Sequence, residues 1–129
     1  MITFEKTDGP SGSTRSTGSV YEDMAVRYLQ KLGWRILERN FRSRSGEIDI
    51  IAADGRSIVF VEVKFRKSNS SGTPLEAVSL YKQRRISNTA LFYLYYARIP
   101  EERPCRFDVI GIDGSERITH IKDAFYACI

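Results

Sequence analysis

The stretch GEIDIIAADGRSIVFVEVKFR at residues 46–66 decides the fold. It contains two runs rich in β-branched residues, 46–53 and 57–65, on either side of the dipeptide Asp54-Gly55. Asp-Gly between two such runs is one of the strongest short-range signals for a β-hairpin. The stretch therefore predicts two antiparallel strands joined by a tight turn.

The second run places charged side chains where a buried strand does not need them. Alternation predicts one face made of Ile58, Phe60, Glu62, Lys64 and Arg66, and the opposite face made of Val59, Val61, Val63 and Phe65. A two-residue turn at Asp54-Gly55 predicts that Ile51 faces Ile58 and that Asp49 faces Phe60. Asp49 would then lie diagonal to Glu62, about 7–8 Å away on the same face.

Two carboxylates beside an ammonium suggest metal chemistry. Oxygen ligands without Cys or His suit Mg²⁺ or Mn²⁺, so Asp49 and Glu62 are the candidate metal ligands, with the Val63 carbonyl as a main-chain ligand. Lys64 beside the metal would orient the attacking water and stabilise charge on a phosphate. The pattern predicts metal-assisted phosphodiester hydrolysis. A purely structural ion-pair network is the alternative, disfavoured because buried ion pairs are expensive to assemble.

Helices and strands follow one another in the rest of the chain. We expect a flexible N-terminal arm over 1–18, rich in Gly, Ser and Thr, and a single domain over 19–129. The pattern predicts helices over 19–32 and 80–97, with a further helical region at 74–78. Further strands are predicted at 34–41, 106–112 and 117–122, with 123–129 as a short helix or tail. This order favours an α/β fold in two or three layers.

Two finer expectations concern burial. The apolar stripe of the second long helix should comprise Leu80, Ile86, Ala90, Tyr93, Leu94 and Ala97. Cys105 and Cys128 lack the neighbours that a zinc site needs, so both are expected to be buried, reduced thiols.

Composition and charge exclude some classes of protein. No run approaches the roughly 18 apolar residues of a membrane helix, and the opening residues do not resemble a secretory signal, so a cytoplasmic location is expected. Twenty Lys and Arg against 16 Asp and Glu give a net charge of +4, which attracts polyanions weakly. Clustered bases are candidate phosphate contacts, although a solvated charged face is the alternative. They are Arg35, Arg39, Arg42, Arg44, Arg66, Lys82 and Arg85.

Asp49 followed by Glu62-Val63-Lys64 across a hairpin resembles the D...(D/E)xK signature of the restriction-endonuclease-like nucleases. The motifs GEID at 46–49, FVEVK at 60–64 and RFDV at 106–109 more closely resemble the YraN-like family of small bacterial proteins, over about 19–112. The resemblance implies a restriction-endonuclease-like mixed central sheet flanked by helices. It also implies DNA as partner, branched or damaged, with Asp49 and Glu62 binding metal and Lys64 catalytic.

The resemblance adds expectations outside the hairpin. Related nucleases place an acid on the first helix, where Glu22 stands, although Ser19 and Glu22 also fit a capping box. Gln83 resembles a helical Gln or Lys near such sites, with a solvent-exposed glutamine as the alternative. Junction-cleaving relatives act as dimers, which suggests a homodimer. A catalytically silent nucleic-acid-binding module in DNA repair, recombination or uptake is the competing function.

Two further polar residues have structural roles as their favoured explanation. Asp108 alternates with Phe107 and Val109, so it either approaches the active face or pairs with a neighbouring Arg, and the ion pair is favoured. His120 shows no partner in the sequence and is not expected to be catalytic.

Overall fold

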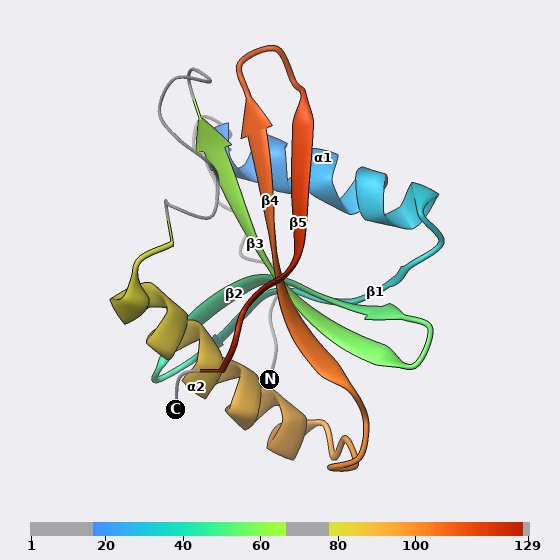
Figure 1. Cartoon of the computed structure of the whole chain (residues 1–129), viewed down its shortest axis with the longest axis vertical. Helices are drawn as coiled ribbons and strands as arrows, with labels where there is room; N and C mark the ends of the chain where they lie inside the picture. The colour runs from blue at the N-terminus through green and yellow to red at the C-terminus, as the bar shows by residue number, and fades with distance from the viewer. Residues whose placement is uncertain (1–16, 67–77, 128–129) are drawn as a thin grey trace, which may run out of the picture.

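A computed structural model describes residues 17–66 and 78–127. It contains two helices and five strands (Figure 1). The elements are α1 (Thr17–Lys31), β1 (Arg35–Ser43), β2 (Gly46–Asp54), β3 (Ser57–Arg66), α2 (Leu80–Tyr96), β4 (Cys105–Asp113) and β5 (Ile118–Phe125).

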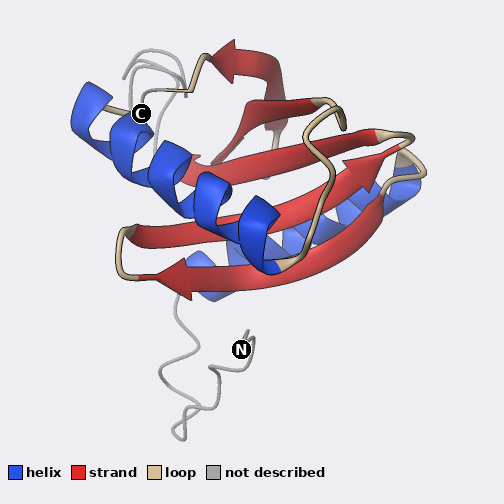
Figure 2. Ribbon diagram, turned by 90° about the horizontal axis from the view of Figure 1, so that it is seen from below, coloured by secondary structure: helices blue, strands red, loops and turns tan. Residues whose placement is uncertain are grey.

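The strands form one mixed sheet in the order β1-β2-β3-β4-β5. β3 and β4 pair in parallel, and the other neighbouring strands are antiparallel. Adjacent parallel strands need a crossover connection, and α2 supplies it. α1 and α2 cover opposite faces of the sheet, so the molecule has three layers (Figure 2). The predicted α/β class, a mixed central sheet flanked by helices, is confirmed.

Each face of the sheet carries its own apolar core. Phe60, Ile51 and Tyr93 belong to the core beneath α2, whereas Val59 and Val61 pack with Leu29 of α1. The alternation predicted along β3 is therefore confirmed. It places Glu62, two residues after Phe60, on the α2 face of the sheet.

The hairpin register differs from the prediction by two residues. Asp54 pairs with Ser57, and Ile51 lies opposite Phe60 rather than Ile58. The reason is that Gly55, with φ +62°, takes the first turn position, so the turn consists of Gly55 and Arg56. A shift of two residues keeps every side chain on its predicted face, whereas a shift of one would have reversed them.

The first helix begins earlier than predicted, whereas α2 begins at Leu80 as predicted. α1 begins at Thr17, so Ser19 lies inside its first turn and the predicted capping box is wrong. Residues 1–16 of the arm predicted at 1–18 lie outside the described residues. In the predicted helical region 74–78, only Val78 is described, and Ser79 caps α2 by accepting the Lys82 N–H over 3.1 Å.

Leu80 is 58% exposed and does not belong to the buried stripe of α2, contrary to the prediction. Six residues at 3.6 per turn place it about 240° around the helix from Ile86, which is buried. Ala90 and Tyr93 are buried as predicted, and Leu94 and Ala97 pack at the margin of the core.

The end of the chain also departs from the prediction. Residues 123–125 continue β5 as a strand instead of forming a helix or tail, because Phe125 pairs with Phe107 beyond an irregularity in the register. Cys105, the first residue of β4, is exposed rather than buried. Cys128 lies outside the described residues.

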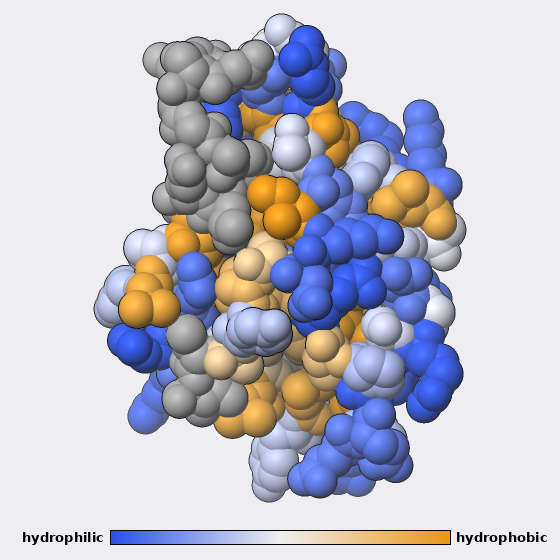
Figure 3. Space-filling view, in the orientation of Figure 1, coloured by the Kyte–Doolittle hydropathy of each residue, from blue (hydrophilic) through white to orange (hydrophobic). Residues whose placement is uncertain are grey.

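The surface is mixed in character. Hydrophilic and apolar groups alternate over the face shown in Figure 3. Within residues 17–66 and 78–127, no helix is long and apolar enough to cross a membrane.

Candidate active site

Asp49 lies where β2 and β3 separate. Ile50 and Val61 form the last residue pair between these strands, and beyond it Asp49 Oδ2 accepts the Val63 N–H over 2.8 Å. The carboxylate thus replaces a main-chain acceptor at the end of the ladder. Because this bond anchors it to β3, Asp49 is held beside Glu62, whose position follows Val61 directly.

Glu62 is almost fully buried, with 5% of the residue exposed. Two ammonium groups approach its Oε2 atom: Lys82 of α2 at 2.9 Å and Lys64 of β3 at 3.6 Å. Lys64 is on the same strand face, two residues along, as the alternation predicted. The predicted convergence of Asp49, Glu62 and Lys64 is therefore present, and α2 adds a second lysine to it.

The acids and lysines shift one another's proton affinities. Burial and then the nearby Glu62 charge raise the pKa of Asp49 well above its ordinary value. Burial and the hydrogen bond with Lys82 lower the pKa of Lys64. Burial alone would lower the pKa of Lys82. Its hydrogen bond to Glu62 outweighs burial, so the pKa of Lys82 is raised. Strongly perturbed groups gathered in a hollow are typical of functional sites.

Both carboxylates line a hollow of about 360 Å³ that opens to solvent. Asp49 and Glu62 contribute from the sheet, and Ser79, Lys82 and Arg85 contribute from the α2 side. Volumes of about 300–1,000 Å³ are usual for sites that take small ligands or part of a larger one. The carboxylates are therefore accessible to a ligand.

Glu22 approaches from α1. Its Oε1 atom accepts a hydrogen bond from Asn40 Nδ2 over 3.1 Å and lies 3.9 Å from Arg39 Nη2. The Glu22 charge also contributes to the raised pKa of Asp49. Asn40 has φ +53°, a left-handed conformation that Asn tolerates better than most residues. The expected helix acid is thus beside the site, although its role there stays a prediction.

The donor set fits a hard divalent cation. No group of three or more His, Cys, Asp or Glu side chains converges within the described ranges, so the side-chain ligands would be Asp49 and Glu62. Mg²⁺ is usually held by one or two carboxylates and completes its shell with waters and substrate phosphate. Asp49, whose pKa is raised beside another anion, is suited to bind such a cation. The Val63 N–H contacts Asp49, and the ligand role of the Val63 carbonyl stays a prediction.

The predicted phosphate contacts separate into two groups. Near the site, Arg85 Nε donates to Ser45 O over 2.7 Å and Arg44 is exposed on the adjoining turn. Arg42 is exposed and lies 3.5 Å from Glu47. Gln83 donates to Val78 O over 3.0 Å, which ties it to the start of its own helix.

The remaining predicted contacts do not form one surface with that group. Arg39 is held 2.7 Å from Asp23 on the α1 face. Arg35 begins β1 opposite Ala53, at the end of β2 away from Asp49. Arg66 ends β3, opposite Asp113 of β4. Their proposed binding roles stay predictions.

Two site contacts were missed from the sequence. Lys82 was predicted to contact phosphate, whereas it forms the closer ion pair with Glu62. Its position one helical turn before the buried Ile86 is the signal that points it toward the sheet. Asn40 was part of the family resemblance without a role at the site, and its tolerance of a left-handed backbone was the available signal.

Asp108 belongs to a separate polar network. It is fully buried on the α1 side, 3.0 Å from Arg106 Nε and 2.8 Å from His120 Nε2. The favoured ion pair is confirmed. Tyr28 Oη meets the other ring nitrogen of His120 over 2.9 Å, so the histidine has partners on both sides.

The mixed sheet with a helix on each face, and paired acids with a lysine where β2 and β3 separate, defines a restriction-endonuclease-like protein. The chain matches the uncharacterised protein family UPF0102 over residues 21–112 and belongs to that family, the YraN-like family of the sequence resemblance.

Relatives within the family cover most of this chain. A UPF0102 protein of Lachnoclostridium phytofermentans is 50% identical over 85% of the chain and 92% of its own length. One of Chlorobium chlorochromatii is 48% identical over 91% of the chain and 96% of its own length. A third, of Colwellia psychrerythraea, is 42% identical over 97% of the chain and all of its own length.

Proposed function

We propose that this protein is a metal-dependent endonuclease that hydrolyses DNA phosphodiester bonds, on branched or damaged DNA. The observation that carries the proposal is the convergence of Asp49, Glu62 and Lys64, with both carboxylates lining a solvent-accessible hollow. Asp49 and Glu62 would hold Mg²⁺ or Mn²⁺, which supplies Lewis-acid activation of water and charge neutralisation at the phosphate.

The chain's own groups divide the remaining work. Lys64, with its lowered pKa, is placed to orient a water and to stabilise negative charge on the phosphate. Arg85 lines the hollow of the site, and Arg44 is exposed on the adjoining turn, where they can contact the flanking backbone phosphates. The Val63 N–H keeps Asp49 in place beside Glu62.

The test is cleavage of end-labelled branched, single-stranded and duplex DNA with Mg²⁺ or Mn²⁺, followed on denaturing gels. Wild type should cut at least one substrate, and Glu62→Gln and Lys64→Met should each lose at least about 100-fold in rate. Glu116→Gln, an exposed carboxylate on the turn between β4 and β5, is the matched control and should cut normally. Cleavage that persists in Glu62→Gln would reject the proposal.

A catalytically silent nucleic-acid-binding module is the second candidate. The 2.9 Å contact of Lys82 with Glu62 favours it, because an ion pair already satisfies this carboxylate. Calorimetric titration with Mn²⁺ separates the two functions. The nuclease should bind Mn²⁺ in a manner that Asp49→Asn abolishes, whereas a closed ion-pair network should take up none.

A further inference from the structure

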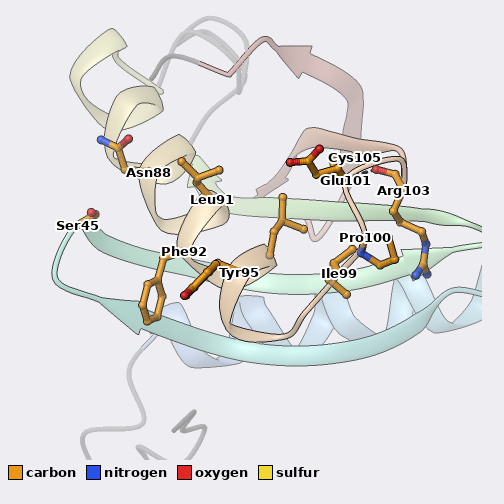
Figure 4. Close-up of a pocket in the computed structure, with 11 residues that line it drawn as sticks. Ser45, Asn88, Leu91, Phe92, Tyr95, Ile99, Pro100, Glu101, Arg103 and Cys105 are labelled. Atoms are coloured by element: carbon orange, nitrogen blue, oxygen red, sulfur yellow. Dashed lines mark hydrogen bonds between the residues drawn. The ribbon is translucent and has the colours of Figure 1, made fainter.

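Three large aromatic side chains stand exposed near the C-terminal end of α2. Phe92, Tyr95 and Tyr96 are 46%, 84% and 45% exposed, and we call them the aromatic patch. Phe92 and Tyr95 lie beside each other in Figure 4. Contiguous exposed apolar surface on a protein marks a binding site more often than isolated apolar residues do.

The rings of the patch are held in a fixed arrangement. The Phe92 and Tyr96 rings are stacked at 19° with centroids 6.1 Å apart. Phe41 of β1, which is 2% exposed, lies 6.1 Å from each of them and supports them from the sheet side. Phe92 and Tyr96 therefore form a stacked pair of rings packed against a buried ring of β1, with the exposed Tyr95 beside them.

Positive charge borders the patch. Phe92 and Tyr96 share a hollow of about 420 Å³ with Arg42 and Arg44, and none of the described residues lining it is acidic. The contact of Arg42 with Glu47 is solvent-exposed on both sides, so it holds the guanidinium only weakly. Aromatic rings beside arginines are the combination that binds the bases and backbone of single-stranded nucleic acids.

The patch is continuous with the candidate active site. Ser45 lines the hollow of the patch, and its carbonyl accepts the hydrogen bond from Arg85. Arg85 in turn lines the hollow that contains Asp49 and Glu62. From Lys82 to Phe92, α2 extends about 15 Å, which a few nucleotides can span.

Resting on the proposed function, we propose that the aromatic patch binds unpaired bases of a single-stranded DNA segment whose backbone continues along α2 into the active site. Bases in a duplex are stacked on one another, so only unpaired bases can stack on these rings. The substrate class is thus DNA with a single-stranded stretch next to the bond that is cut. Symmetric pairing of two copies through this patch would bring like-charged Arg42 and Arg44 side chains together.

The experiment measures binding in EDTA, without cleavage, by fluorescence anisotropy of a 5′-fluorescein 15-mer of dT and of a mixed-sequence duplex of equal length. Full-length wild type should bind the single strand more tightly than the duplex. Phe92→Leu/Tyr96→Leu, which keeps apolar bulk without rings, should weaken dT binding about tenfold or more. Phe92→Tyr/Tyr96→Phe, which keeps both rings, should bind dT as wild type does.

Two single variants guard against a folding artefact. Tyr95→Ala removes a ring that is 84% exposed, so the fold is unaffected, and dT binding should still weaken. Leu32→Ala, 48% exposed after α1 on the opposite face, should bind dT as wild type does. Thermal melts of each variant verify folding.

Several results would overturn the inference. Equal dT affinity of wild type and the leucine double variant is one. Another is a patch-dependent dimer in light scattering, or patch-dependent binding to phosphatidylglycerol vesicles, with dT affinity unchanged. Binding of dT that depends on the patch, with no cleavage of any DNA, would support the patch and reject the nuclease. Cleavage of DNA, together with dT binding that does not depend on the patch, would support the nuclease and reject the role of the patch.

Discussion

Lys82 Nζ lies closer to Glu62 Oε2, at 2.9 Å, than Lys64 does, at 3.6 Å. The side chain of Glu62 is 6% exposed, so these two ammonium groups are its partners in place of bulk water. Lys82 of α2 and Lys64 of β3 therefore both compensate the charge of one nearly buried carboxylate. Because Lys82 lies on a helix and Glu62 on a strand, this ion pair also links α2 to the sheet at the candidate site.

Lys82→Met should lower the free energy of unfolding at pH 7 by about 1–2 kcal/mol, because Glu62 loses its nearer partner while Lys64 remains. Urea denaturation measures the change. Lys31→Met, an exposed lysine at the end of α1, serves as control and should stay within about 0.5 kcal/mol of wild type. In a Glu62→Gln background the Lys82→Met cost should shrink, and an undiminished cost would contradict the pairing.

Gly46→Ala should destabilise the protein by about 1–3 kcal/mol. Gly46 has φ +150°, and a Cβ there would lie 3.1 Å from Arg85 Nε, so the substitution also presses on the side chain that reaches Ser45. Gly33→Ala is the control for backbone strain alone, since its φ is +92° with nothing within 4 Å.

The same clash predicts coupling between Gly46 and Arg85. In an Arg85→Ala background, the added Cβ of Gly46→Ala meets no guanidinium, so its cost in unfolding free energy should fall by about 1 kcal/mol. If the unfolding free-energy costs of Gly46→Ala and Arg85→Ala simply add in a double-mutant cycle, contact with the Arg85 side chain does not contribute to the cost of Gly46→Ala.

Asp108→Asn should cost about 3 kcal/mol at pH 7, because Arg106 and His120 lose a fully buried charged acceptor. Burial alone would raise the Asp108 pKa, but hydrogen bonds from His120, the Asp123 N–H and Arg106 lower it below its ordinary value of 3.8. A lowered folded pKa adds stability above the unfolded pKa and loses it as pH falls through the folded value.

The part of the difference between wild type and Asp108→Asn that the lowered Asp108 pKa supplies should therefore be full at pH 5 and should narrow below about pH 4. Urea unfolding at pH 7, 5 and 3 measures it. Glu116→Gln, exposed on the neighbouring turn, provides the carboxylate control. A gap in unfolding free energy that widens between pH 5 and pH 3 would mean that the Asp108 pKa is raised in the folded protein.

Asn40→Gly and Asn40→Ala separate backbone strain from side-chain contact. Both remove the hydrogen bond to Glu22, but only Ala opposes the φ of +53°. Asn40→Ala should be less stable than Asn40→Gly by about 1 kcal/mol in thermal or urea unfolding. If the Gly variant were the less stable one, the left-handed conformation of Asn40 would not be a constraint.

Much of the hairpin was predictable because its causes are local. The alternation of residues along β3 placed Glu62 and Lys64 on one face, and Asp-Gly marked the turn. The register was missed by two residues, since it depends on which residue takes the positive φ at the turn. Because side chains alternate with a period of two, this error left the faces unchanged.

By itself, the sequence determined most of the strands and helices and the face of the sheet on which Glu62 and Lys64 lie, because these follow from patterns among near neighbours in the chain. The tertiary structure alone decided that Lys82 reaches Glu62, that Asn40 holds Glu22 and that the Val63 amide anchors Asp49. Each of these contacts joins different secondary-structure elements, and its geometry depends on how the strands diverge within the sheet or on how the helices pack against it.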